Sequence, residues 1–273
     1  MMMQGKKGLV MGVANDRSIA WGIAKKLASE GAEIAFTYQG DALKKRVTPL
    51  ATSIGSSILI PCDVTDSKSM TNTFETLKNK WGNIDFLVHC IGFSNKDELR
   101  GKYYNTSSEN FNQTMHISCY SFTEACRLAE PIMNNGGSIL TLTYYGSEQV
   151  MPHYNVMGVA KAALEASVRY LAVDMGEKNI RVNAISAGPI KTLAASGIGD
   201  FRFILRWNEL NAPLKRNVNQ EDVGNSALYL LSDLGSAVTG EIQHVDCGYH
   251  TVGMVATDEA KKVSELLEEF SKD

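Results

Sequence analysis

The chain has 273 residues, of which 44% are hydrophobic and 21% are charged, and its net charge at pH 7 is −3. This balance is ordinary for a soluble globular protein, and it excludes the broad basic surface that binding to nucleic acid requires. No apolar run is long enough to span a bilayer, and the first apolar stretch is broken by Gly and polar residues too soon for an export signal, so we expect a cytoplasmic protein.

Short apolar strands alternate with helical stretches along the chain, and the segment between residues 188 and 220 is predicted to be irregular. The predicted strands are residues 8–13, 33–38, 57–64, 84–92, 137–146, 180–188 and 242–248. The predicted helices are residues 18–30, a stretch ending at about 54, 67–81, 109–133, 153–175, 220–232 and a terminal helix at about 258–271. Continuous apolar strands indicate a sheet covered on both faces. The pattern predicts an α/β fold with a doubly wound parallel sheet of about seven strands (Rossmann-type), in a single domain over residues 1–273.

The turn after the first strand has features of a phosphate-binding loop. Gly12 supplies a tight turn, and Ser18 and Ile19 stand at the start of the next helix, where N–H groups are free and Ser is a good cap. Gly22 is expected to let this helix pack closely on the sheet. The G-x-G-x-x-G pattern is absent, so an ordinary strand–helix turn stays an open alternative.

Further candidates for a dinucleotide site follow the next three strands. Gln39 stands where this fold meets the adenosine ribose; a neutral residue there, with no basic neighbour, favours NADH without securing it. Asp63 is suited to hold the adenine amino group, helped by the backbone of Val64, or to cap the helix that follows. Gly92 suits a cofactor lying against the end of the fourth strand. His89, inside that strand, is expected to be a core histidine.

The cysteines are scattered, and no two form a C-x-x-C pair. This spacing favours neither a metal site nor a disulfide framework, so we expect reduced thiols packed in the core. They are Cys62, Cys90, Cys119, Cys126 and Cys247.

A tyrosine and a lysine lie seven residues apart in the sequence YNVMGVAK. On a helix that spacing is almost two turns, so Tyr154 and Lys161 share one face, separated along the axis by about 10 Å. A nicotinamide ribose can bridge them, with Lys161 on its hydroxyls and the lysine charge lowering the pKa of the phenol. By spacing alone, a packed aromatic and a solvated lysine are the simpler interpretation. The position after the fifth strand of a dinucleotide fold favours the functional one.

Longer segments strengthen this interpretation. They include GVANDRSIAWGIA, LTLTYYGSE, PHYNVMGVAKAALEASVRYLA, RVNAISAGPIKTLAASGI and DVGNSALYLLSDL. With its Tyr-x6-Lys spacing, the chain resembles the divergent short-chain dehydrogenases/reductases. Within them it resembles the bacterial NADH-dependent enoyl-(acyl-carrier-protein) reductases, over residues 5 to 255.

The resemblance implies roles for individual residues. Tyr154 matches the tyrosine on the enoyl carbonyl, Lys161 the lysine on the nicotinamide ribose, and Tyr144 the second active-site tyrosine, where ordinary members carry a serine. Strand alternation sends the neighbouring Tyr145 to the other face. Ser94 matches a position whose backbone contacts substrate. The cofactor positions implied are Gly12, Ser18, Ile19, Gln39, Asp63, Val64, Ile91, Gly92, Ile190, Lys191, Thr192, Leu193 and Ala194.

The segment at about 192–210 is predicted to be a lid, because it is long, follows Gly188–Pro189 and carries scattered apolar residues. Ile198, Phe201 and Ile204 are candidates to cover an acyl chain, with Met157 in the same pocket; ordinary packing into the core is the alternative. Acyl carrier protein, the expected partner, is acidic. The basic residues near the lid that could meet it are Lys191, Arg202, Arg206, Lys215 and Arg216.

The function predicted from these residues and this resemblance is hydride transfer from NADH to the trans-2 double bond of an enoyl thioester on acyl carrier protein. This is the last step of each fatty acid elongation cycle. The α-carbon takes its proton from Tyr154 or from water. A carbonyl or alcohol oxidoreductase and a non-catalytic nucleotide-binding protein are the alternatives. The resemblance also implies a homotetramer.

Overall fold

The computed structural model describes residues 1–134, 136–193, 195 and 199–271. Within these residues, seven parallel strands form one sheet in the order β3-β2-β1-β4-β5-β6-β7. This order confirms the predicted doubly wound sheet, although several strands end earlier than predicted. The strands are β1 (Lys7–Met11), β2 (Glu33–Tyr38), β3 (Ile58–Pro61), β4 (Phe86–His89), β5 (Gly137–Thr143), β6 (Ile180–Ala187) and β7 (Ile242–Val245).

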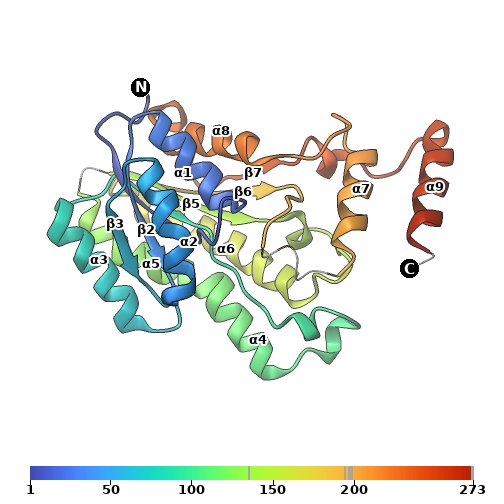
Figure 1. Cartoon of the computed structure of the whole chain (residues 1–273), viewed down its shortest axis with the longest axis horizontal. Helices are drawn as coiled ribbons and strands as arrows, with labels where there is room; N and C mark the ends of the chain where they lie inside the picture. The colour runs from blue at the N-terminus through green and yellow to red at the C-terminus, as the bar shows by residue number, and fades with distance from the viewer. Residues whose placement is uncertain (135, 194, 196–198, 272–273) are drawn as a thin grey trace.

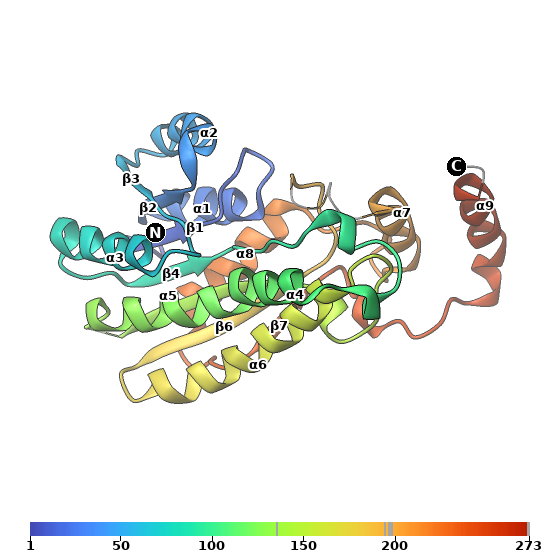
Figure 2. The ribbon, with the colours of Figure 1, turned by 90° about the horizontal axis from the view of Figure 1, so that it is seen from below.

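Helices cover both faces of the sheet, as Figures 1 and 2 show. On one face lie α1 (Ile19–Ser29), α2 (Gly40–Ser53) and α8 (Gln220–Leu231). The other face carries α3 (Ser67–Trp81), α4 (Ser108–Met115), α5 (Ser121–Ala129) and α6 (Val156–Gly176). Each layer encloses its own apolar core: Leu9 and Met11 of β1 point into one, and Val10 between them points into the other. Successive strand residues face opposite sides of the sheet, and both sides are covered by helices. Both sets of side chains are therefore buried, which is why these strands are apolar throughout.

The topology reverses at β1, which pairs with β2 on one side and β4 on the other. At such a switch point the loops after neighbouring strands diverge and leave a crevice outside the carboxyl ends. Gly12 follows β1 with a φ of +94°, and a Cβ there would lie 2.0 Å from the carbonyl oxygen of Cys90. Only glycine permits this close approach of the two backbones.

Two predicted segments differ from the structure. The long helix predicted at 109–133 is α4 and α5 joined by a π-helical turn, His116–Tyr120, and followed by a 3₁₀ turn, Glu130–Ile132. The segment predicted to be irregular contains a helix, α7 (Phe201–Asn211). Its inner face includes Ile204, Leu205 and Asn208, all buried. Asn208 on this face donates a hydrogen bond to the side chain of Asn217 at 3.2 Å.

The terminal helix, α9 (Ala260–Phe270), was predicted and is present. It stands beside α7, away from the sheet (Figure 1). The ring of Phe270 meets that of Phe203 edge-on at 5.4 Å between centroids, and the guanidinium of Arg202 lies over its face at 5.1 Å. Leu266 is buried. The helix therefore rests on α7 and adds none of the residues of the two sheet cores.

Candidate active site

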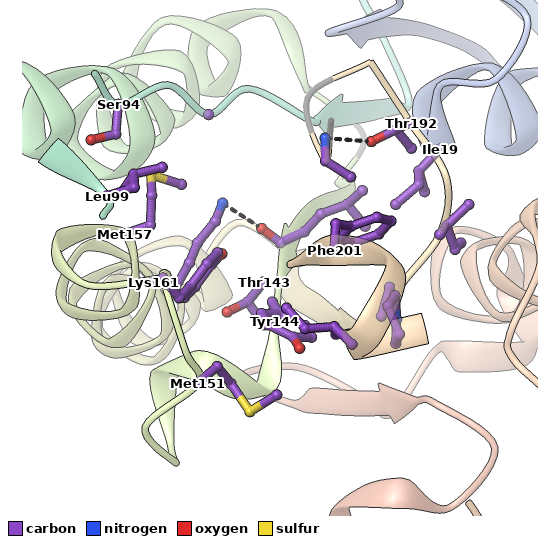
Figure 3. Close-up of a pocket in the computed structure, with 18 of the residues that line it drawn as sticks. Ile19, Ser94, Leu99, Thr143, Tyr144, Met151, Met157, Lys161, Thr192 and Phe201 are labelled. Atoms are coloured by element: carbon purple, nitrogen blue, oxygen red, sulfur yellow. Dashed lines mark hydrogen bonds between the residues drawn. The ribbon is translucent and has the colours of Figure 1, made fainter. Parts of the chain in front are cut away.

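A cavity of about 310 Å³ opens at the carboxyl ends of the central strands. Its walls come from the ends of β4, β5 and β6, the loop after β4, the start of α6, and α7 (Figure 3). Many residues predicted for cofactor and substrate meet here, although they lie far apart in the sequence. They are Ile19, Ile91, Gly92, Ser94, Tyr144, Tyr154, Met157, Lys161, Ile190, Thr192, Phe201 and Ile204.

Two tyrosines form a pair in this cavity. The rings of Tyr144 and Tyr154 meet edge to face, with 5.1 Å between centroids and 79° between planes. Tyr144 lines the cavity and follows the last residue of β5 in an extended conformation. Tyr145 begins a 3₁₀ turn instead, and its ring packs against Tyr249 at 6.0 Å. The turn therefore directs only the first of the two adjacent tyrosines toward the cavity.

The prediction that Tyr154 lies on a helix with Lys161 is wrong. Helix α6 begins at Val156, and the two residues flanking Tyr154 have positive φ, 58° at His153 and 39° at Asn155. The side chain of Asn155 donates hydrogen bonds to the carbonyls of Leu99 and Gly101, at 3.0 and 3.2 Å. These contacts stabilise the turn that swings Tyr154 into the cavity, where it is 7% exposed.

Burial sets the protonation of the Tyr154 phenol. Desolvation raises its pKa, and the nearby groups Tyr144 and Glu165 raise it further. Burial therefore outweighs any lowering of this pKa by Lys161, and the expected lowered pKa of the phenol is not found. The phenol therefore keeps its proton at physiological pH and is able to donate a hydrogen bond. Burial raises the pKa of Tyr144 as well.

Lys161 extends from α6 into the same cavity. Its ammonium donates a hydrogen bond to the carbonyl oxygen of Leu142 at 2.9 Å, drawn as a dashed line in Figure 3. The residue is 8% exposed, and burial lowers its pKa to about 8 from the usual 10.5, against the opposing influence of Cys90, Cys119 and Glu165. An ammonium carries three N–H donors, so two remain for a ligand.

The loop before α1 differs in detail from its prediction. The Ser18 hydroxyl does not cap α1; it accepts from the N–H groups of Ala14 and Asn15, at 3.0 and 3.1 Å. The Ser18 hydroxyl therefore fixes the loop. The first N–H groups of α1 have no partner within the helix and stay available to a ligand. Gly22 does not serve packing on the sheet: a Cβ there would lie 2.7 Å from Gln220 of α8, so it permits contact between the two helices.

Gln39 and Asp63 form a pair at the ends of β2 and β3. The Gln39 amide donates to an Asp63 carboxylate oxygen at 2.9 Å, which leaves the Gln39 carbonyl as the acceptor for a sugar hydroxyl. Hydrogen bonds from Thr65, with a smaller one from Gln39, lower the pKa of Asp63. Asp66, not Asp63, caps α3, so the alternative helix-cap interpretation of Asp63 is wrong. The side chain of Val64 packs in the core, so only its backbone can face a ligand.

Of the remaining predicted residues, some line the cavity and others lie beside it. Thr192 lines it and accepts from the N–H of Ala195 at 3.1 Å (Figure 3). Ser94 is turned toward α4, where its hydroxyl accepts from Thr114 at 2.9 Å, in keeping with a backbone role. Lys191 lies in a neighbouring groove, and Leu193 is half exposed. Ala194 and Ile198 lie outside the described residues.

Several residues that line the cavity had no distinctive sequence signal. Leu99 and Met151 contribute apolar surface from two loops, and Thr143 lies beside Tyr144. An isolated apolar residue in a loop has no periodicity, so only the fold reveals it. His89 is buried, bonds Ser121 at 2.9 Å and does not line the cavity; burial lowers its pKa to about 3, consistent with a core histidine.

All five cysteines are free thiols, and four of them are buried. Across the described ranges, no group of three or more His, Cys, Asp or Glu side chains is arranged to hold a metal ion. In the same part of the chain, no helix combines the length and the apolar character needed to cross a membrane.

Comparison with known proteins identifies what this chain is similar to. Residues 12–250 match the model of a family described as enoyl-(acyl carrier protein) reductase. The chain is 70% identical over 257 residues to enoyl-(acyl-carrier-protein) reductase (NADH) 1 of Rhizobium meliloti, covering 94% of each chain. It is 60% identical to enoyl-(acyl-carrier-protein) reductase (NADH) FabI of Rickettsia typhi, covering 92% of this chain and 97% of that one.

A solved structure has the same fold. It is the enoyl-(acyl-carrier-protein) reductase of Anaplasma phagocytophilum in complex with NAD, with a TM-score of 0.91 and 62% identity. The alignment covers 94% of this chain and 98% of that one. Similarity at this level extends through the strand ends, the loops and the helices that build the cavity.

Proposed function

The chain belongs to the enoyl-(acyl carrier protein) reductase family, and on that premise we propose that it reduces the trans-2 double bond of an enoyl thioester on acyl carrier protein, with NADH as the hydride donor. This reaction completes each cycle of fatty acid elongation. The observation that carries the proposal is the meeting of a buried ammonium, Lys161, with a protonated tyrosine pair, Tyr144 and Tyr154, in one cavity at the strand ends.

The residues present fit a nicotinamide dinucleotide. Gly12 permits the backbone approach that a pyrophosphate needs, and the loop that follows it leads to the free amides at the start of α1. The Gln39–Asp63 pair suits the adenosine end. Lys161 has two N–H donors for the hydroxyls of the nicotinamide ribose. When bound, NADH supplies the hydride for the β-carbon of the substrate.

Tyr154 stabilises the charge that the reaction builds on the substrate. As the β-carbon is reduced, negative charge gathers on the thioester oxygen, and a fixed O–H donor stabilises it most where water is excluded. Burial disfavours a phenolate at Tyr154. The residue is therefore suited to hold its proton and bond the oxygen, which favours water as the source of the proton for the α-carbon.

We also propose that α7 is the lid of the site. Phe201 and Ile204 lie on its inner side and line the cavity, so they are placed to cover an acyl chain. Arg202 and Arg206 face a groove of about 480 Å³ beside the cavity, together with Arg17 and Lys191. This basic rim supports docking of the acidic carrier protein next to the lid.

The first prediction separates the two functional residues. Tyr154→Phe should lower kcat about a hundredfold, the scale of losing one charge-stabilising donor, and leave the Kd for NADH unchanged. Lys161→Ala should weaken NADH binding at least tenfold, because the ribose loses its donor. Absorbance of NADH with a trans-2-enoyl thioester gives kcat, and quenching of protein fluorescence gives Kd. NADH binding without turnover of the thioester by the unmodified enzyme would refute the reductase.

A second prediction concerns the carrier. Arg206→Glu should raise the KM for an enoyl thioester on acyl carrier protein about tenfold, and leave the KM for the same acyl group on coenzyme A within about twofold. Lys25→Glu, an exposed charge reversal on α1, is the matched control. Equal effects of the two reversals would argue against a docking role for the basic rim.

The homotetramer implied by the family resemblance is a further proposal. Tyr170 and Val173 on α6 are 77% and 76% exposed, and adjacent exposed apolar side chains on a helix favour a subunit contact. Light scattering should give a mass four times that of the chain, and Tyr170→Glu should lower it. A mass of one chain for the unmodified protein would contradict this assembly.

A further inference from the structure

A buried carboxylate lies beneath the active site. Glu165 follows Lys161 by four residues on α6 and is 7% exposed. Its Oε1 atom accepts a hydrogen bond of 2.5 Å from the hydroxyl of Thr143 and a second, short one from the hydroxyl of Ser147. A carboxylate can only accept, so it suits two converging hydroxyl donors. Burying a carboxylate is costly without such partners, and the residue is therefore held where it is by this geometry.

The two hydroxyls bracket the active-site tyrosine. Thr143 directly precedes Tyr144, and Ser147 closes the turn that follows it. The Ser147 N–H donates to the carbonyl of Tyr144 at 2.9 Å, and the Ser147 hydroxyl lies 2.9 Å from the same carbonyl. Since the hydroxyl has a single proton, it bonds either that carbonyl or Glu165. The bond to Glu165 ties the turn to α6, whereas the bond to the Tyr144 carbonyl closes the turn on itself. The hydroxyl of Thr143 ties the end of β5 to α6 in either case.

The same turn also supports Tyr154. A Cβ at Gly146 would lie 2.4 Å from the Tyr154 ring, and a Cβ at Gly158 would lie 2.6 Å from the Gly146 carbonyl oxygen. The turn is thus pressed between the first residues of α6 and the ring of Tyr154. A shift of this turn would move Tyr144 and the surface against which Tyr154 rests.

We propose that Glu165 is a positioning residue: by bonding Thr143 and Ser147 it fastens the turn of Tyr144 to α6 and holds the two tyrosines in their edge-to-face arrangement. Glu165 also has an electrostatic effect on the site. Its negative charge favours the ammonium form of Lys161 and disfavours the phenolate of Tyr154. The inference rests on the proposed reductase function for its kinetic part.

The kinetic test compares two substitutions of different chemistry. Glu165→Leu removes the acceptor and should lower kcat for the enoyl thioester at least tenfold. At about pH 6, below the pKa of about 8 of Lys161, that lysine stays charged without Glu165, so the Kd for NADH should stay within about twofold. Glu165→Gln keeps a carbonyl acceptor and should retain kcat within about fivefold. The pair Thr143→Val with Ser147→Ala removes the donors and should reproduce Glu165→Leu even if the latter folds poorly.

Glu124→Leu and Glu124→Gln are the matched controls. Glu124 is 2% exposed on α5, does not line the cavity and forms an ion pair with Arg127 at 3.5 Å. Its replacement should reduce stability without lowering kcat of the folded enzyme. If Glu165→Leu lowers Tm and leaves kcat unchanged, as in these controls, Glu165 contributes only to stability and the positioning role is contradicted.

Coupling tests whether Glu165 acts through Tyr144. In a Tyr144→Ala background, Glu165→Leu should lose most of its effect on kcat, because residues that act as a unit are not additive. Full additivity would overturn the proposal. A second readout needs no activity: 3-fluorotyrosine at position 144 should shift its fluorine resonance in Glu165→Leu and not in Glu124→Leu. A resonance that does not move overturns the positioning role while leaving the reductase untouched.

Discussion

The site depends on one buried charge. Lys161 carries an ammonium into a position where burial lowers its pKa to about 8, and a charge without partners there would be costly. The carbonyl of Leu142, at the end of β5, takes one of its N–H donors and fixes its direction. Glu165 offsets part of the desolvation. A residue that costs folding energy in this way is expected where function requires it.

Near Lys161, the backbone departs from regular structure in the turn that carries Tyr154. His153 and Asn155 have positive φ, a conformation that non-glycine residues rarely adopt, and they carry Tyr154 out of α6. The Asn155 side chain offsets that strain by bonding the loop after β4. One short turn therefore joins the phenol, the loop that closes the cavity, and the helix that bears Lys161.

Much of this could be predicted from sequence, and the failures have physical causes. Apolar runs and helical stretches alternate clearly, so the sheet and most helices follow from pattern. The resemblance to the reductase family assigned Tyr144, Tyr154 and Lys161 to the site. Helix α7 was missed because its apolar residues were interpreted as the scattered apolar residues of a lid. His and Asn adopt positive φ more often than other non-glycine residues, but the sequence alone does not fix where they do so, and Tyr154 was therefore placed on the helix. Glu165 reads as a surface residue until the fold brings Thr143 and Ser147 to it.

The most direct test of this account is the pH dependence of NADH binding. The folded pKa of Lys161 is lowered, so its proton is lost as the pH rises through about 8, and with it the positive charge and one of the two N–H donors left for the ribose. The Kd for NADH should stay constant below that pH and rise by up to about tenfold per pH unit above it. In Lys161→Met, binding should be weaker and independent of pH over the same range. A Kd that is flat for the unmodified protein, or an equal slope in the variant, would contradict the role of the buried ammonium.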